Sequence, residues 1–296
     1  MAPPTTPRPI EWPTLWVAAA IYGAWLALTW FYHDLPGWFL YPAAAATIAW
    51  HGSLQHEVLH GHPTGRRGID EALAWPPLAL WLPYPIYRDS HVAHHRVATL
   101  TCPIADPESF YVTAATWRRL GPIARAVLRF NMTLLGRLLV GPALALGRFV
   151  AIEARQVAAG DRRRLAVWFW HAVAIVPVFW WVSGVCGIPA PAYVLGFVYP
   201  GLALTLLRSY AEHRPHRDPA GRTIVCEASW PLRLLFLNNN YHAEHHAHPT
   251  RPWYELAALA RARTVSTSYR ATGYAGLIVR HLLTMRDQPV HPTIGR

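Results

Sequence analysis

Long apolar runs divide the chain into two pairs of candidate membrane-spanning segments. Residues 13–32 contain no charged side chain, and a second apolar segment covers residues 38–56. The same pattern returns at residues 165–185 and 190–208. A helix needs about 20 mostly apolar residues to cross the hydrocarbon core of a bilayer. Each of the four segments is therefore predicted to be a transmembrane helix, although the last is short unless the side chain of Arg208 extends to the membrane surface.

The connection within each pair is short. Residues 33–37 separate the first two segments, and a turn around Gly187 and Pro189 separates the other two. Each pair therefore predicts a helical hairpin rather than a signal peptide followed by a soluble domain. We expect a single all-α integral membrane domain over residues 1–296, with four transmembrane helices arranged as two hairpins.

The remaining segments are predicted to form a helical cap on one side of the membrane. Residues 117–159 alternate arginine with apolar side chains at near-helical spacing, which is typical of amphipathic helices on a membrane surface. Residues 253–285 predict one or two further short helices. Prolines interrupt the apolar residues 72–87, which favours an interfacial or re-entrant segment over a straight span.

Charge then indicates the orientation of the hairpins. The 27 basic residues are all arginine, against 16 acidic residues, and they lie in the N-terminal tail, in residues 56–164 or after residue 207. Because cytoplasmic loops carry the arginine excess, both termini and the cap are predicted to face the cytoplasm, in a plasma or inner membrane. This placement favours a solvated surface facing anionic lipid over a nucleic-acid-binding face. Three scattered cysteines exclude a disulfide framework and a CxxC metal knuckle.

Nine of the 17 histidines fall into four groups within the predicted cap. Residues three or four apart on a helix share one face, so the imidazoles of each group would project together. One tetrahedral zinc ion takes three or four ligands, so nine donors suit two ions with four or five ligands each. Imidazole binds Zn, Cu, Fe and Ni, which leaves the metal open. The nine candidate ligands are His56, His60, His91, His94, His95, His213, His242, His245 and His246.

Other polar residues near these groups have open roles. Each of them either orients an imidazole through its second nitrogen or is solvated. They are His51, His62 and His248, together with Glu57, Glu212 and Glu244. A structural or solvated role is expected for the five remaining histidines outside the groups, which are His33, His171, His216, His281 and His291.

With these motifs in place, the chain resembles the membrane fatty-acid desaturase superfamily, which includes alkane hydroxylases and carotenoid ketolases. The order HxxxH, HxxHH, lone histidine, HxxHH is matched by the nine histidines between residues 56 and 246. The resemblance implies two iron ions held by these nine histidines at the cytoplasmic membrane face. It also implies O2 as a co-substrate and two electrons from a separate protein of the ferredoxin, rubredoxin or cytochrome type.

The resemblance leaves the reaction open within this superfamily. An acyl-chain desaturase acting on unactivated C–H bonds of a lipid-like substrate is the first expectation. Ser209 stands where acyl-CoA desaturases usually carry asparagine, and residues 210–213 and 245–251 look like motifs of alkane hydroxylases. A hydroxylase or ketolase of an alkane, carotenoid or other amphiphile is therefore the alternative.

Two readings from other classes also fit parts of the sequence. His56, Glu57 and His60 spell the HExxH motif of a zinc protease, with the glutamate as general base. That reading leaves seven of the nine grouped histidines without a role. A metal transporter is disfavoured because transport sites lie near the bilayer midplane, whereas these groups lie beyond the ends of the spans.

Overall fold

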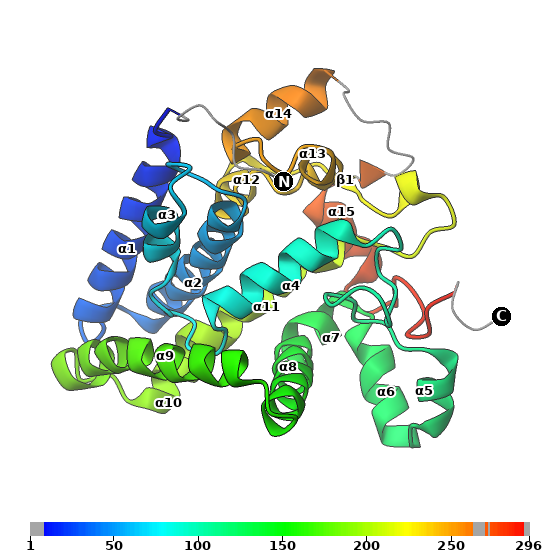
Figure 1. The fold of residues 1–296 in the computed structure, drawn as a ribbon, viewed down its shortest axis with the longest axis horizontal. Coiled ribbons are helices and arrows are strands. Elements are labelled where there is room, and N and C mark those ends of the chain that lie inside the picture. The colour runs from blue at the N-terminus through cyan, green and yellow to red at the C-terminus, as the bar shows by residue number, and fades with distance from the viewer. Residues whose placement is uncertain (1–8, 263–269, 272, 293–296) are drawn as a thin grey trace.

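Helices make up nearly all the regular structure in the computed structural model, which describes residues 9–262, 270–271 and 273–292 (Figure 1). Within these residues, the two strands are β1 (Val225–Cys226) and β2 (Arg270–Ala271), which pair in parallel over two residues each. The prediction of an all-helical protein is confirmed at this level, and the strand pair only joins two cap segments.

Both predicted hairpins are present. The first joins α1 (Trp12–Trp30) to α2 (Gly37–Leu59). In the second, α9 (Arg162–Phe179) continues as the π-helical segment η1 (Trp180–Val185). The chain returns through α10 (Ala190–Tyr193), the π-helical η2 (Val194–Val198) and α11 (Tyr199–Glu212). The helices extend a few residues past the apolar runs at their polar ends.

Among the described residues, three helical stretches are long and apolar enough to cross a membrane. They are Trp12–Trp30, Arg162–Val185 and Ala190–Glu212. The fourth predicted span, α2, has 23 residues but is not among the three. Every 18-residue stretch of α2 contains Pro42, Trp50 and His51, and these side chains keep its mean hydropathy low. Three of the four predicted spans are thus supported by length and composition.

Arg208 does not extend to the membrane surface. Its helix continues to Glu212, so the stretch reaches membrane length without a snorkelling side chain. The guanidinium is buried, and its Nε lies 3.1 Å from Oε1 of Glu212. The alternative that Arg208 snorkels is therefore wrong, because an ion pair inside the protein compensates its charge.

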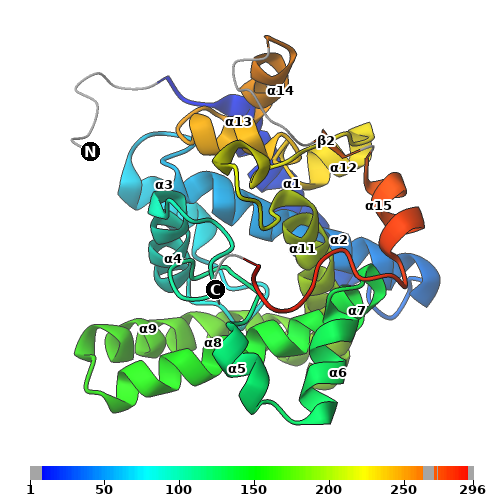
Figure 2. The same ribbon diagram turned by 90° about the vertical axis from the view of Figure 1, so that its right-hand side faces the viewer.

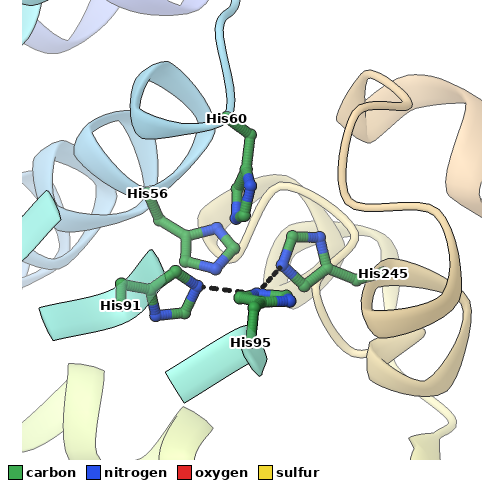
Figure 3. Close-up of side chains that lie close together, drawn as sticks. All are labelled: His56, His60, His91, His95 and His245. Carbon is green, nitrogen blue, oxygen red and sulfur yellow. Dashed lines mark hydrogen bonds between the residues drawn. The ribbon is translucent and has the colours of Figure 1, made fainter. Parts of the chain in front are cut away.

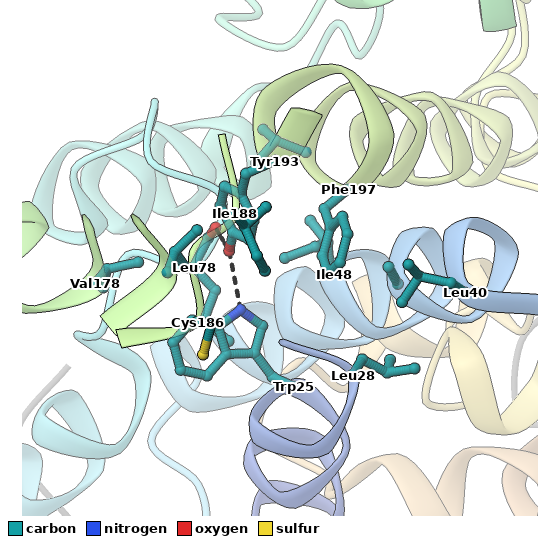
Figure 4. Close-up of a cluster of buried hydrophobic side chains, with 13 residues drawn as sticks. Trp25, Leu28, Leu40, Ile48, Leu78, Val178, Cys186, Ile188, Tyr193 and Phe197 are labelled. Carbon is teal, nitrogen blue, oxygen red and sulfur yellow. Dashed lines mark hydrogen bonds between the residues drawn. The ribbon is translucent and has the colours of Figure 1, made fainter. Parts of the chain in front are cut away.

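The ends of the two hairpins that carry the turns share one hydrophobic core (Figure 4). Trp25 of α1 donates from Nε1 to the hydroxyl of Tyr193 at 2.9 Å, and that hydroxyl donates to the carbonyl of Leu78 at 2.7 Å. A ring nitrogen of His33 in the first turn lies 3.2 Å from the carbonyl oxygen of Cys186 in the second. Both turns therefore lie at the same end of the bundle, as two hairpins of equal orientation require.

The proline-rich residues 75–83 enter this core without forming a helix. Leu78 is 1% exposed, and its carbonyl is satisfied by Tyr193. The carbonyl of Leu80 lies 2.7 Å from Nε2 of His171 in α9. Irregular backbone at this depth is tolerated where neighbouring helices satisfy its polar groups. The prediction that a straight span is absent here is confirmed.

Close packing of α2 on α11 brings the two hairpins together. A Cβ atom on Gly201 would lie 2.6 Å from Cβ and Cγ2 of Ile48 and 3.2 Å from the carbonyl oxygen of Ala45. Only glycine permits this approach, which is typical of small residues at helix contacts within membranes. The inner ends of α2 and α11 are consequently held side by side.

The cap is built from short helices around these inner ends (Figures 1 and 2). Those before α9 are α3 (Arg67–Ala74), α4 (Tyr84–Arg96), α5 (Ala114–Arg119), α6 (Pro122–Asn131), α7 (Leu134–Leu139) and α8 (Gly141–Ala158). After α11 come the 3-10 turn η3 (Pro219–Gly221) and then α12 (Trp230–Leu235), α13 (His242–Ala247), α14 (Trp253–Ala262) and α15 (Tyr274–His281). Both predicted helical regions of the cap are confirmed for the described residues, and residues 263–269 and 272 of the second region lie outside them.

Candidate metal centre

Five histidines from three elements form the first cluster. His56 lies in the last turn of α2 and His60 follows as its C-terminal cap, His91 and His95 lie one turn apart on α4, and His245 comes from α13. One ring nitrogen from each lies within 4.8 Å of the corresponding nitrogens of the others. Figure 3 shows the five rings converging on one region from these elements. Helical spacing explains the two pairs, whereas His245 is added by the tertiary fold.

Four histidines form the second cluster beside the first. His94 lies on α4, His213 follows the last residue of α11, and His242 and His246 lie one turn apart on α13. Their ring nitrogens also lie within 4.8 Å of one another. The structure thus brings together all nine histidines singled out in the sequence and divides them five and four. Both clusters are able to bind metal ions, and the role of each residue as a ligand stays a prediction.

The ring nitrogens of the first cluster are close enough for several of them to bind one ion. In the first cluster, Nε2 of His95 lies 3.0 Å from Nε2 of His91 and 3.1 Å from Nε2 of His245. Two nitrogens each about 2.1 Å from an ion are about 3.0 Å apart at a right angle and about 3.4 Å apart at a tetrahedral angle. These two pairs therefore have the spacing of nitrogens that bind one ion together.

The second cluster has the same spacing. Nε2 of His213 lies 3.1 Å from Nε2 of His94 and 2.9 Å from Nε2 of His242, which lies 3.1 Å from Nε2 of His246. In the first cluster, Nε2 of His56 and Nε2 of His60 are buried without a hydrogen-bond partner among the described residues. A bound ion would satisfy them.

Burial favours the neutral, metal-binding form of most of these imidazoles. It lowers the pKa of His242, His245 and His246 well below the usual range, with neighbouring histidines adding to the effect. Burial and adjacent histidines also lower the pKa values of His95 and His213 to about 3.

His94 is the exception. Burial lowers its pKa, but the charge of Glu108 and a hydrogen bond and charge from Asp106 outweigh this effect and raise the pKa to about 9. In the metal-free protein this imidazole therefore carries a proton at neutral pH. A metal ion must displace that proton in order to bind.

Acceptors behind the rings fix the orientation of several imidazoles. Nδ1 of His91 lies 2.8 Å from Oε1 of Glu108, and Nδ1 of His94 lies 2.8 Å from Oδ1 of Asp106. Nδ1 of His242 lies 3.2 Å from Oδ1 of Asn239. These contacts place the N–H on Nδ1 and leave Nε2 for a metal. None of these three acceptors was predicted from the sequence, although Asp106 and Glu108, two acidic residues in a proline-containing segment soon after His95, were a usable signal.

The polar residues that flank the grouped histidines differ in what they contact. Glu212 is close to the second cluster, with Oε1 3.6 Å from Nδ1 of His242. Glu57 instead accepts the backbone N–H of Trp253 at 2.9 Å, and His62 contacts Glu11 at 2.6 Å. His51 lies 3.4 Å from the hydroxyl of Tyr22. His248 follows α13 as its C-terminal cap and Glu244 is buried within that helix.

The five histidines expected to be structural lie outside both clusters. His33 and His171 contact backbone carbonyls, as described above. His291 is buried, with Nε2 3.0 Å from the hydroxyl of Thr101, and His216 makes local contacts with Asp218. His281 lies at the end of α15.

A large cavity reaches the second cluster from one side. Its volume is about 1010 Å³, and α2, α4, α8 and α11 contribute to its walls. His94 and His213 lie at the wall together with Tyr87. Apolar side chains such as Trp81, Phe149 and Leu202 line other parts of it. The cavity therefore has room for a long apolar molecule beside the second cluster.

Comparison with known proteins gives one family. The family model described as "Fatty acid desaturase" matches residues 35–272, which include both clusters and most of the cavity wall. A search of curated proteins finds no match.

Proposed function

The chain belongs to the fatty acid desaturase family, a family of di-iron oxidoreductases, and from this premise we propose that it uses O2 to oxidise an unactivated C–H bond of a lipid-like substrate. Desaturation of an acyl chain is the first candidate reaction. The observation that carries the proposal is the pairing of two adjacent histidine clusters with a cavity that reaches one of them.

We assign one iron ion to each cluster. His56, His60, His91, His95 and His245 would hold the first, and His94, His213, His242 and His246 the second. When bound, the iron supplies the oxidising power for O2 chemistry, which no side chain can supply. The protein's contribution is to present Nε2 atoms of neutral imidazoles and to hold the rings in place through acceptors at Nδ1. Membership of a family of di-iron oxidoreductases supports iron as the metal.

Hydroxylation is the second candidate reaction. It is favoured by Ser209 in place of asparagine and by the likeness of residues 210–213 and 245–251 to alkane hydroxylase motifs. Both reactions begin with the removal of hydrogen from the same kind of C–H bond. The position of that bond in the cavity relative to the second cluster would decide between them.

The zinc-protease reading loses support at Glu57. A general base must lie within hydrogen-bond reach of the proton that it abstracts. The carboxylate of Glu57 is held by the backbone of Trp253 and lies 3.9 Å from Nε2 of His62. It therefore faces the start of α14, whereas the imidazoles of His56 and His60 face the first cluster.

A separate electron-transfer protein of the ferredoxin, rubredoxin or cytochrome type is part of this proposal, because the chain carries no haem-binding HPGG-like segment and no four-cysteine rubredoxin pattern. We also propose that both termini and both clusters face the cytoplasm of a plasma or inner membrane. The positions of the arginines along the chain support that orientation.

Expression in a host of defined lipid composition, with and without isotopically labelled O2, tests the reaction. Mass spectrometry would detect a loss of two hydrogens for desaturation or a gain of one labelled oxygen for hydroxylation. About two iron ions per chain are expected, and His94→Ala or His245→Ala should abolish iron binding and turnover. His281→Ala, a histidine outside both clusters, is the matched control. One zinc ion per chain with O2-independent activity would refute the proposal.

A further inference from the structure

Arg137 is a buried cation without an acidic partner. Its side chain in α7 is 2% exposed, and Nε and Nη2 have no hydrogen-bond partner within the described part of the chain. No carboxylate of the described residues forms an ion pair with it. A buried charge is costly unless it is paired, and no negative charge of the described residues compensates this guanidinium.

Other arginines at the same cavity are already satisfied. Arg163 pairs with Asp89 at 2.8 Å, Arg164 pairs with Glu153, and Arg148 donates to the carbonyl of Ser109. The unpaired state of Arg137 is therefore a local property and not a general feature of the arginines that line this cavity.

The two unpaired donors of Arg137 match a carboxylate. Nε–H and Nη2–H lie along one edge of the planar guanidinium, and this edge can bind both oxygens of a carboxylate at once. The ring of Phe110 covers one face, with its centroid 3.6 Å from Cζ. The edge itself is buried in the cavity wall, so a carboxylate would reach it only when the neighbouring side chains move aside. Burial lowers the pKa of Arg137 to about 9, which still leaves the group charged at neutral pH.

The local fold places Arg137 specifically. Thr133 caps α7 by accepting the N–H of Gly136, and a Cβ atom on Gly136 would lie 1.8 Å from the carbonyl oxygen of Phe130. Only glycine allows this tight junction between α6 and α7. The junction positions Arg137 in the cavity wall beside Asn131, whose buried Oδ1 also has no partner among the described residues.

The same cavity joins Arg137 to the second histidine cluster. Both Arg137 and His213 line it, and a short chain of contacts runs between them through the protein. Cζ of Arg137 lies 5.8 Å from the ring centroid of Tyr210, Cζ of Arg286 lies 4.6 Å from that centroid, and Nη2 of Arg286 donates to the carbonyl of His213 at 2.6 Å.

We propose that Arg137 binds the carboxylate of the substrate, so that the substrate is a free amphiphilic acid and not a thioester, a lipid ester or an alkane. This inference rests on the proposed function for its link to oxidation, but the binding that it describes does not require turnover. The apolar walls accept the hydrocarbon tail, and the guanidinium edge neutralises the head.

Equilibrium binding without O2 tests the proposal. The iron-loaded protein in uncharged detergent would be titrated with dodecanoate, methyl dodecanoate and acetate. We expect dodecanoate to bind at least about tenfold more tightly than its methyl ester, and acetate to bind far more weakly because it has no tail. Equal binding of dodecanoate and the ester, or of dodecanoate and acetate, would overturn the proposal.

Variants then assign the effect to Arg137. Arg137→Met should weaken dodecanoate binding about 10- to 100-fold and change binding of the ester less than about twofold. Arg137→Lys keeps a positive charge but lacks the two parallel N–H donors, so its affinity for dodecanoate should lie between those of the wild type and Arg137→Met. It replaces the methionine variant if that variant does not fold. Arg148→Met, at the same cavity, is the matched control and should bind dodecanoate as the wild type does. Unchanged dodecanoate binding in both Arg137 variants would overturn the assignment.

Failure of this inference can be told from failure of the proposed function. Arg137→Met should keep its iron and still oxidise methyl dodecanoate in the presence of O2 and an electron donor. Loss of oxidation of every probe by the wild type, with acid-selective binding intact, would count against the oxidase function and leave the carboxylate site standing.

Discussion

The carboxylate of Glu108 determines how His91 presents its nitrogens. It lies 2.8 Å from Nδ1 of His91. Although burial raises its pKa, the charges of His91 and His94 and the hydrogen bond to His91 lower the pKa further, to below its usual range. An ionised acceptor behind a histidine fixes the tautomer and makes the other nitrogen a stronger ligand.

Glu108→Gln should therefore weaken metal binding at the first cluster. The glutamine keeps an acceptor oxygen but loses the charge, so we expect metal affinity to fall about tenfold. Metal content after dialysis against graded chelator concentrations would measure the change. Glu255→Gln, which removes a surface carboxylate paired with Arg251, should leave metal content unchanged. Equal metal retention in both variants would contradict this role of Glu108.

The raised pKa of His94 predicts a pH dependence at the second cluster. The proton is held below pH 9 and must leave before Nε2 can bind an ion. Apparent metal affinity there should rise about tenfold per pH unit between pH 7 and 9. Titration of the metal-free protein with Co²⁺ at several pH values would measure it. Affinity that stays constant over this interval would contradict the prediction.

The same shift acts on stability in the opposite direction. Because the folded protein raises the pKa of His94, the protonated imidazole stabilises the metal-free fold at pH values below about 6.5, and this contribution is lost as pH rises through about 9. Metal binding and stability of the metal-free protein should therefore change in opposite senses across this interval.

Residue types and spacings were sufficient to predict the nine clustered histidines, but not what surrounds them. The histidine groups can be recognised in the sequence because i, i+3 and i+4 positions share a helix face. Asp106 and Glu108 lie in a segment without regular structure, so their contact with α4 depends on tertiary folding. The lack of a partner for Arg137 is likewise a property of the folded chain and has no sequence signature.

At the scale of the elements, hydropathy predicted the hairpins well and their polar ends poorly. The apolar runs ended near Leu207, whereas α11 continues to Glu212. Arg208 and Glu212 pair with each other on this extra turn, inside the protein, and a scale based on single residues does not take such a pair into account. The π-helical segments η1 and η2 also carried no signal that was recognised in the sequence.

The close contact between α2 and α11 predicts that the protein is destabilised when Gly201 is replaced by a larger residue. Gly201→Ala would place a methyl group 2.6 Å from Ile48, which forces the helices apart and should cost about 1–3 kcal/mol of unfolding free energy. Gly23→Ala in α1 is the matched control because nothing lies within 4 Å of its added Cβ. Thermal unfolding in detergent should show a lower Tm for Gly201→Ala alone. Equal Tm values would show that the helices adjust without cost.

Across the whole molecule, the two clusters connect segments that are far apart in the sequence. Their histidines span residues 56 to 246 and come from α2, α4, α13 and the end of α11. An ion that binds the folded clusters but not the unfolded chain stabilises the fold by mass action. A metal ion bound at either cluster would therefore stabilise the fold as well.

Removal of metal should accordingly lower thermal stability. At a free metal concentration about 100 times the dissociation constant, one site contributes about 2.7 kcal/mol, so chelation should lower Tm by several degrees. Differential scanning calorimetry with and without chelator would measure the shift. His245→Ala should respond less than the wild type, and His281→Ala should respond equally. A Tm that does not change on chelation would contradict the coupling.

The cavity lined by Arg137, His94 and His213 would also determine which carbon of the substrate is oxidised. With the head group anchored at a fixed point, the carbon that reaches the second cluster is set by its number from the carboxyl end. Acids of different chain length should then be oxidised at the same carbon counted from the head, and the excess length would extend along the apolar wall. Positional selectivity would in that case be a distance built into the fold.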